Sequence, residues 1–135
     1  MLIENSEQIP VGAMIARELI TEGACCAYFT ELWGGLVFVR PDLVCVKPEE
    51  VAEQFIAAMR AAMNGRLAGL PDVLAFFPDG RIVLREAKNV GAKDRLNPQQ
   101  HEFARVARRL FGVRVDFAVV EWGHKKPNSE VSLAP

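Results

Sequence analysis

The sequence predicts an α/β domain in which helices pack against a β-sheet. Helical and extended patterns alternate along the 135 residues, without internal repeats or low-complexity tracts. Half of the residues are apolar, which suffices for one ordinary core in a chain of this length. We therefore expect a single domain over residues 1–135, with the motif-bearing part at about 21–123 and peripheral tails at 1–10 and 124–135.

The periodicity of apolar residues predicts the elements of the first half of the chain. They are helices at 11–20 and from about Thr21 to Gly34-Gly35, strands at 36–40 and 43–47, and a helix at 49–65. Thr21 is the expected N-cap of the second of these helices. Pro48 introduces the third, whose first turn is acidic and whose apolar stripe is typical of core packing.

Two apolar, strand-like runs around Pro78-Asp79-Gly80 predict a β-hairpin. Proline presets φ, and glycine accepts the left-handed conformation of a three-residue hairpin loop. Phe77 is therefore expected to face Arg81 across the two strands.

Two acidic residues and a lysine come together if this register continues along the hairpin. Asp72 then lies directly across from Glu86, and Lys88 joins the same face two residues further on. Opposed positions bring Cβ atoms to about 4.5–5.5 Å, where two ionised carboxylates repel each other unless a cation or a shared proton intervenes. A divalent metal meets that need, since carboxylates are hard oxygen ligands suited to Mg²⁺ or Mn²⁺. We expect the chemistry of the protein at this position.

A helix and a strand are expected after the hairpin. Asn97 can cap a helix that has proline at its first position, and Gln100 can complete a capping box. Gln99 and Gln100 flank the apolar face about equally, so periodicity leaves open which of them points toward the sheet. Gly112 ends this helix, and residues 113–122 predict the last strand.

The two halves of the chain carry opposite charge. Residues 1–80 hold 5 basic and 11 acidic side chains, and residues 81–126 hold 11 basic and 5 acidic ones, within a net charge of −1. The basic half contains Glu86 and Lys88, so phosphate affinity and candidate catalytic groups share one stretch of sequence. A solvated charged face is the alternative interpretation. On the last helix the outer side is basic and carries His101, Arg105, Arg108 and Arg109.

The sequence lacks the patterns of membrane-spanning and secreted proteins. No stretch approaches the roughly 20 apolar residues of a membrane span, and the acidic N-terminus does not resemble a signal peptide. The cysteines, of which Cys25 and Cys26 are adjacent, form neither an even disulfide framework nor a zinc pattern. We expect a cytoplasmic protein with no membrane partner.

Four motifs come in a recognisable order along the chain. They are a Gly-x-Pro-Asp opening at Gly69, a Glu-x-Lys strand at Glu86, an Asp-Arg-Leu stretch at 94–96, and Gln100 near the start of a helix. In this order they resemble the PD-(D/E)XK nuclease superfamily and, within it, the VRR-NUC branch. The resemblance covers about half of the chain and implies a restriction-endonuclease-like mixed β-sheet flanked by helices.

The resemblance also implies roles for individual residues. Asp72 and Glu86 would ligate Mg²⁺ or Mn²⁺, and Lys88 would position or activate the attacking water. Gln100, rather than Gln99, would approach the active site from its helix.

A further metal-ligating glutamate is implied on the first core helix. Glu22 is preferred over Glu18 and Glu31, because it stands thirteen residues before Gly35 and the strand that follows. The basic residues expected to bind nucleic acid are Arg85, Lys93 and Arg95, and a salt bridge within the loop is the alternative for Arg95.

The function that the resemblance implies is metal-dependent endonuclease activity on phosphodiester bonds of DNA. The family favours structured DNA, such as junctions and flaps, and its small members act as homodimers. Two alternatives stay open, namely a catalytically inactive nucleic-acid-binding or assembly module with a nuclease fold, and a nuclease directed at RNA.

Overall fold

The structure is a computed structural model that describes residues 2–4, 7–32, 35–89, 91, 95–123 and 133–134. Its helices are α1 (Val11–Thr21), α2 (Glu50–Ala62) and α3 (Pro98–Phe111). The strands of the main sheet are β3 (Cys26–Leu32), β4 (Leu36–Val39), β5 (Cys45–Val46), β6 (Val73–Phe76), β7 (Ile82–Asn89), β8 (Val115–Trp122) and β9 (Leu133–Ala134). Two further strands, β1 (Leu2–Glu4) and β2 (Glu7–Ile9), form a small sheet of their own.

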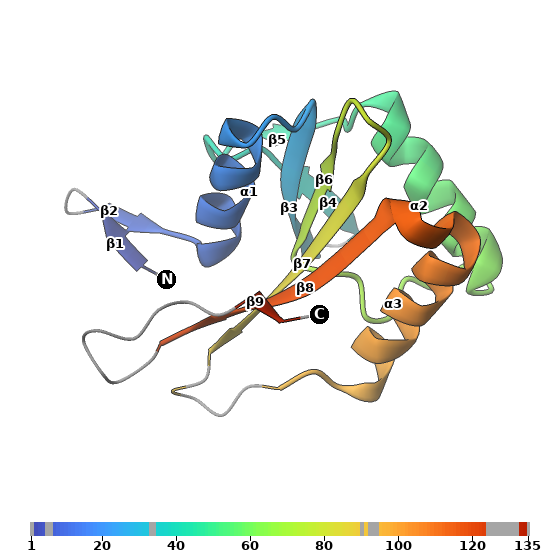
Figure 1. Cartoon of the computed structure of the whole chain (residues 1–135). Helices are drawn as coiled ribbons and strands as arrows, with labels where there is room; N and C mark the ends of the chain where they lie inside the picture. The colour runs from blue at the N-terminus through green and yellow to red at the C-terminus, as the bar shows by residue number, and fades with distance from the viewer. Residues whose placement is uncertain are drawn as a thin grey trace.

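The main sheet is mixed and lies between helices. Its strand order is β5-β4-β3-β6-β7-β8-β9, and β7 and β8 run parallel while the other neighbours are antiparallel. Helix α1 covers one face, and α2 and α3 cover the other (Figure 1). This arrangement confirms the predicted α/β class. Among the described residues, no helix combines the length and the apolar character of a membrane span.

Successive side chains of the central strands point to opposite faces of the sheet, so the core consists of two clusters. Leu74 of β6 and Leu84 of β7 pack against α2 and α3, where Phe103 is completely buried. Val73 and Val83, one residue away on the same strands, pack against α1 instead. A side chain on these strands therefore faces the α2–α3 layer or the α1 layer according to its position in the alternation.

The predicted hairpin is confirmed, including its register. The Phe77 N–H donates to the Arg81 carbonyl at 3.0 Å, and Gly80, at φ +92°, closes the loop through its N–H to the Phe77 carbonyl. The ladder of strand pairs runs from Phe76 opposite Ile82 to Val73 opposite Arg85.

The second predicted helix, from about Thr21 to Gly34-Gly35, is wrong. Helix α1 ends at Thr21, Gly23 turns the chain at φ +114°, and β3 follows from Cys26. Tyr28 belongs to the core under α2 and α3, and Phe29 to the core under α1. Because both faces of β3 are buried, its sequence lacks the polar alternation of a half-exposed strand.

The remaining expectations agree with the structure to within a few residues at their ends. The helices predicted at 11–20, 49–65 and after Asn97 are α1, α2 and α3, and the strands at 36–40, 43–47 and 113–122 are β4, β5 and β8. Both expected tails contain strands, because β1 and β2 lie within residues 1–10 and β9 pairs with β8. Leu133–Ala134 of the C-terminal tail extend the main sheet at its edge.

Gly12 sets how closely α1 approaches the sheet. A Cβ at this position would lie 2.8 Å from the Phe29 Cβ of β3. Alanine normally stabilises a helix interior relative to glycine by up to about 1 kcal/mol. Here we expect Gly12→Ala to destabilise the protein by about 2 kcal/mol, because the helix must move away from the sheet. Denaturant unfolding measures the change, and a more stable variant would contradict this packing.

Candidate active site

Asp72 is held between two strands at the open end of the hairpin. Its carbonyl accepts a 2.9 Å hydrogen bond from the Thr30 N–H of β3. Its carboxylate oxygen Oδ2 accepts a 2.8 Å hydrogen bond from the Ala87 N–H of β7. The Thr30 hydroxyl also donates to the Pro71 carbonyl at 2.9 Å. Asp72 is therefore fixed by both neighbours of β6.

Glu86 and Lys88 are the buried charged side chains among the described residues. Glu86 is 2 % exposed and Lys88 is 7 % exposed. They lie two and four residues after Leu84 on β7, so their side chains point to the same face as Leu84, which α2 and α3 cover. The hairpin register, continued one residue beyond its last pair, puts Asp72 opposite Glu86. The expected grouping of Asp72, Glu86 and Lys88 at one end of one face agrees with this backbone geometry.

A polar cavity of about 550 Å³ lies beside Asp72. It is formed between the loop that precedes β6, the end of β3 and the first turn of α3. Its lining residues are Thr30, Glu31, Leu67, Ala68, Gly69, Leu70, Asp72, Asn97, Gln99 and Gln100. The volume falls in the range of small-ligand sites, and the lining supplies carboxylates, amides and a hydroxyl.

Gly69 lets the loop before β6 rest directly on the start of α3. It has φ +80°, a conformation that favours glycine. A Cβ here would overlap the Gln99 carbonyl and the Gln100 nitrogen of α3. The glycine of the Gly-x-Pro-Asp motif is thus required by backbone conformation and by close approach. It sets the distance between the loop leading to Asp72 and the helix that lines the cavity.

The first turn of α3 is organised by a capping box, as predicted. The Gln100 N–H donates to Asn97 Oδ1 at 2.9 Å, and the Asn97 N–H donates to Gln100 Oε1 at 2.9 Å. Gln99 and Gln100 both line the cavity that Asp72 also lines. Because the Gln100 oxygen is engaged in the cap, its amino group is what this side chain can offer a ligand.

Tyr28 lies on the same sheet face, two residues before Thr30. Its hydroxyl accepts a 2.9 Å hydrogen bond from the Glu49 N–H at the start of α2. Burial is the main cause that raises the pKa of Tyr28 to about 12. The phenol is therefore neutral at physiological pH and links β3 to α2 rather than serving as a base.

The structure does not bring Glu22 to the acidic pair, which corrects the expected third metal ligand. Glu22 is exposed and caps the end of α1. The chain then enters β3 at the turn end of the hairpin, where the Cys25 N–H donates to the Phe76 carbonyl at 2.8 Å. Asp72 lies at the opposite end of β6, about 13 Å away along the strand.

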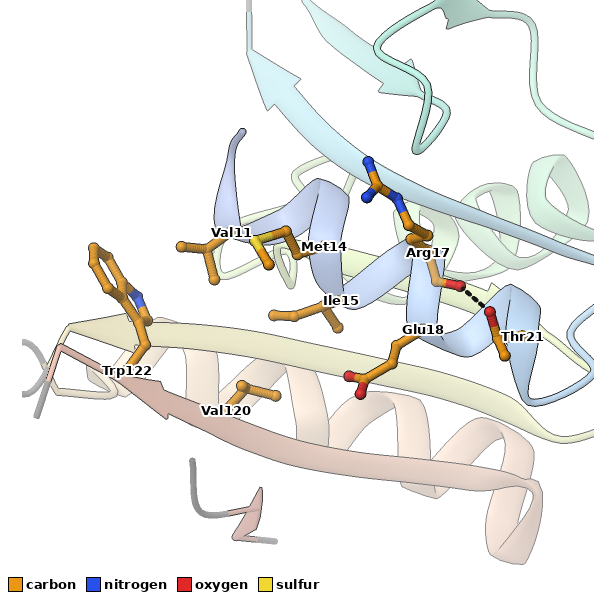
Figure 2. A pocket seen from close by; sticks show the side chains of 8 residues that line it. All are labelled: Val11, Met14, Ile15, Arg17, Glu18, Thr21, Val120 and Trp122. Carbon is orange, nitrogen blue, oxygen red and sulfur yellow. Dashed lines mark hydrogen bonds between the residues drawn. The ribbon is translucent and has the colours of Figure 1, made fainter. Parts of the chain in front are cut away.

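Glu18, the alternative on the same helix, lies on the other face of the sheet. It lines a second cavity, of about 400 Å³, between α1 and β8. Figure 2 shows Glu18 extending from α1 into this cavity on the same side as Ile15, with Val120 and Trp122 contributed by β8. Most of this lining is apolar, and Asp72, Glu86 and Lys88 are not part of it.

Two further acidic residues lie near the site. The sequence pattern does not favour the first, Glu31, and does not indicate the second, Glu121. Glu31, placed in a helix by its sequence pattern, is on β3 and lines the polar cavity with Asp72. Glu121 pairs with Lys88 in the parallel ladder of β7 and β8, so the two side chains share a face. The aromatic and β-branched content of 26–32 was the signal that could have placed Glu31 on a strand.

The three expected nucleic-acid-binding residues lie in different surroundings. The side chain of Arg85 is 11 % exposed and bonded to Asp116, with Nη1 at 3.2 Å from Oδ1, on the α1 side of the sheet, and its binding role stays a prediction. Arg95 is exposed in the segment that leads into α3, and its binding role stays a prediction. Lys93 and its neighbour Asp94 lie outside the described residues.

The donor set near Asp72 suits a metal that keeps most of its water ligands. Among the described residues, no cluster of three or more His, Cys, Asp or Glu side chains is arranged for a metal ion. Mg²⁺ is commonly bound by one or two carboxylates together with water and substrate phosphate. Asp72 and Glu86 fit that requirement in number and in chemistry.

Known proteins give no further guide to this site. Comparisons of the chain with protein-family models, curated proteins and solved structures find no match.

Proposed function

We propose that this protein is a metal-dependent nuclease of the PD-(D/E)XK type that hydrolyses phosphodiester bonds in structured DNA, such as junctions or flaps. The observation that carries the proposal is the grouping of Asp72, Glu86 and Lys88 at one end of one sheet face, beside a polar cavity. The mixed sheet flanked by helices supports a restriction-endonuclease-like fold.

Asp72 and Glu86 would hold the Mg²⁺ or Mn²⁺ ion. The bound metal would lower the pKa of a water ligand and offset charge on the scissile phosphate. Asp72 already accepts the Ala87 N–H through Oδ2, so Oδ1 is the oxygen left for a metal. That hydrogen bond also holds the carboxylate in place against β7 before a metal arrives.

Lys88 would supply the positive charge at this site. The residue is 7 % exposed on the strand that carries Glu86, so the effective dielectric around it is lower than in water. From there it can stabilise charge that develops on the phosphate or exchange a proton with the attacking water. The amino group of Gln100 can donate to a substrate oxygen in the cavity.

A homodimer would give this short chain two active sites for two DNA strands. The proposal for a single chain does not depend on dimer formation.

The test is a cleavage panel with Mg²⁺ or Mn²⁺ on matched DNA and RNA forms of a flap, a four-way junction, a duplex and a single strand. We expect cleavage of the flap or the junction with either metal and no cleavage in EDTA, because the carboxylate pair requires a cation. Gel electrophoresis of end-labelled strands measures the products.

Two results would redirect the proposal. DNA binding without cleavage of any substrate in either metal would favour the inactive binding module. Cleavage confined to the RNA forms would favour an RNA-directed nuclease.

A further inference from the structure

Exposed arginines gather at the end of α3 that lies away from the cavity. They are Arg108 and Arg109 in the last turn of α3 and Arg114 just after it, and we call them the arginine cluster. Within the described part of the chain, no ion pair includes any of the three. The cluster therefore presents several positive charges to solvent.

Local contacts hold the cluster in place. Arg114 Nε donates to the Gly80 carbonyl at 2.9 Å, and its guanidinium lies 5.7 Å from the centre of the Phe111 ring. Arg108 Nη2 donates to the Val115 carbonyl at 3.3 Å. These bonds join the end of α3 to the hairpin turn and to β8, so at least two of the guanidinium groups are oriented before any ligand arrives.

The outer side of α3 connects the cluster to the cavity. Asn97, Gln99 and Gln100 line the cavity at one end, and the helix runs for 14 residues to the cluster at the other. At 1.5 Å per residue this is about 20 Å. Between the two ends, Arg105 is exposed and its charge is offset by Glu102, to which Nε donates at 3.0 Å. Arg109 also helps to hold the pKa of the Glu102 carboxyl below its usual value, after the larger effect of Arg105.

We propose that the outer side of α3 binds a double-stranded arm of the nucleic-acid substrate, with the arginine cluster contacting backbone phosphates about six base pairs from the scissile bond. This inference rests on the proposed function, because the distance of six base pairs is counted from the phosphate that would be held near Asp72. Arginine forms strong charge-assisted hydrogen bonds with phosphate oxygens.

An anionic membrane surface is the competing partner for this region. Leu110 is 43 % exposed and Val113 is fully exposed, so apolar side chains accompany the arginines. A DNA duplex is favoured because the arginine cluster and the polar cavity lie at the two ends of α3, and a rigid duplex can span that distance. The test therefore includes both partners.

The experiment measures DNA binding by fluorescence anisotropy in EDTA, where cleavage cannot occur. The probes are flap DNAs whose duplex arm is 4, 8 or 12 base pairs long. The variant is Arg109→Gln with Arg114→Gln, and Arg109→Gln alone is included because Arg114 also bonds the hairpin turn. Arg17→Gln is the matched control, since Arg17 is exposed on α1 at the opposite face of the sheet.

For arms of 8 and 12 base pairs, the double variant is expected to bind about tenfold more weakly than wild type and to lower the salt slope by about 1.8. For the arm of 4 base pairs, wild type and both arginine variants should bind equally, because the duplex ends before the cluster. Arg17→Gln should bind like wild type throughout.

If the double variant lost the same DNA affinity on short and long arms, the inference would be overturned. A similar loss of DNA affinity in Arg17→Gln would also overturn it. Vesicles of phosphatidylserine and phosphatidylcholine that bind wild type but not the double variant, while arm length has no effect, would assign the cluster to a membrane instead. An arm-length effect without any cleavage would contradict the proposed nuclease function but support the duplex-binding site. Cleavage without an arm-length effect would support the nuclease function and contradict the duplex-binding site.

Discussion

Asp72→Ala is expected to reduce metal-dependent cleavage by about a thousandfold while DNA binding in EDTA changes little. The substitution removes one of the two proposed metal-binding carboxylates. It also removes the acceptor of the Ala87 N–H, which would be left without this bond at the edge of the cavity. Initial cleavage rates on the best substrate of the panel measure the loss.

A more conservative variant separates the metal from the hydrogen bond. Asp72→Asn keeps an oxygen that can accept the Ala87 N–H but removes the negative charge, so we expect near-normal stability with a similar loss of cleavage. Asp79→Ala is the matched control, because Asp79 is an exposed acid at the turn end of the same hairpin, where it pairs with Arg81 at 3.0 Å. Wild-type cleavage by Asp72→Asn would contradict the assignment of Asp72 as a metal ligand.

Gly69→Ala is expected to destabilise the protein by about 3 kcal/mol, of which roughly half comes from the left-handed backbone and the rest from contact with α3. The new Cβ would overlap the Gln99 carbonyl, so the loop and the helix must separate. Since Asp72 follows three residues later, cleavage should fall as well, even at temperatures where the variant is folded.

Gly65→Ala isolates the two contributions. Gly65 has a similar φ of +82°, but no atom lies within 4 Å of the position of its Cβ. We therefore expect a loss of about 1 kcal/mol and unchanged cleavage in this variant. Denaturant unfolding of both variants gives the difference, and equal losses would mean that Gly69 does not control the approach of the loop to α3.

The parts of the fold that local sequence determines were predictable. The hairpin turn needs proline and glycine at the first and third positions of its three-residue loop, and the start of α3 needs Asn97 and Gln100 three residues apart. Each of these is decided by residues within one turn of the chain. The register of Asp72 and Glu86 follows from that turn alone, which is why it could be stated before the structure.

The parts that depend on distant partners were not predictable from local pattern. Local pattern predicts a helix where β3 lies, because the burial of this strand between β4 and β6 removes the polar alternation that marks an exposed strand. The ion-pair partner of Arg85, Asp116, lies 31 residues later on a parallel strand, so local pattern does not indicate it. Glu31, which lines the cavity with Asp72, lies on the strand that local pattern does not predict.

The parallel pairing of β7 and β8 also affects the order in which the site can assemble. The hairpin joins Asp72 to β7 through neighbours in sequence, whereas β8 reaches β7 only after the chain has crossed over through α3. Such a long loop closes more slowly than a hairpin. The pairing of Lys88 with its neighbour on β8, Glu121, therefore spans a longer stretch of chain than the pairing that places Asp72 opposite Glu86.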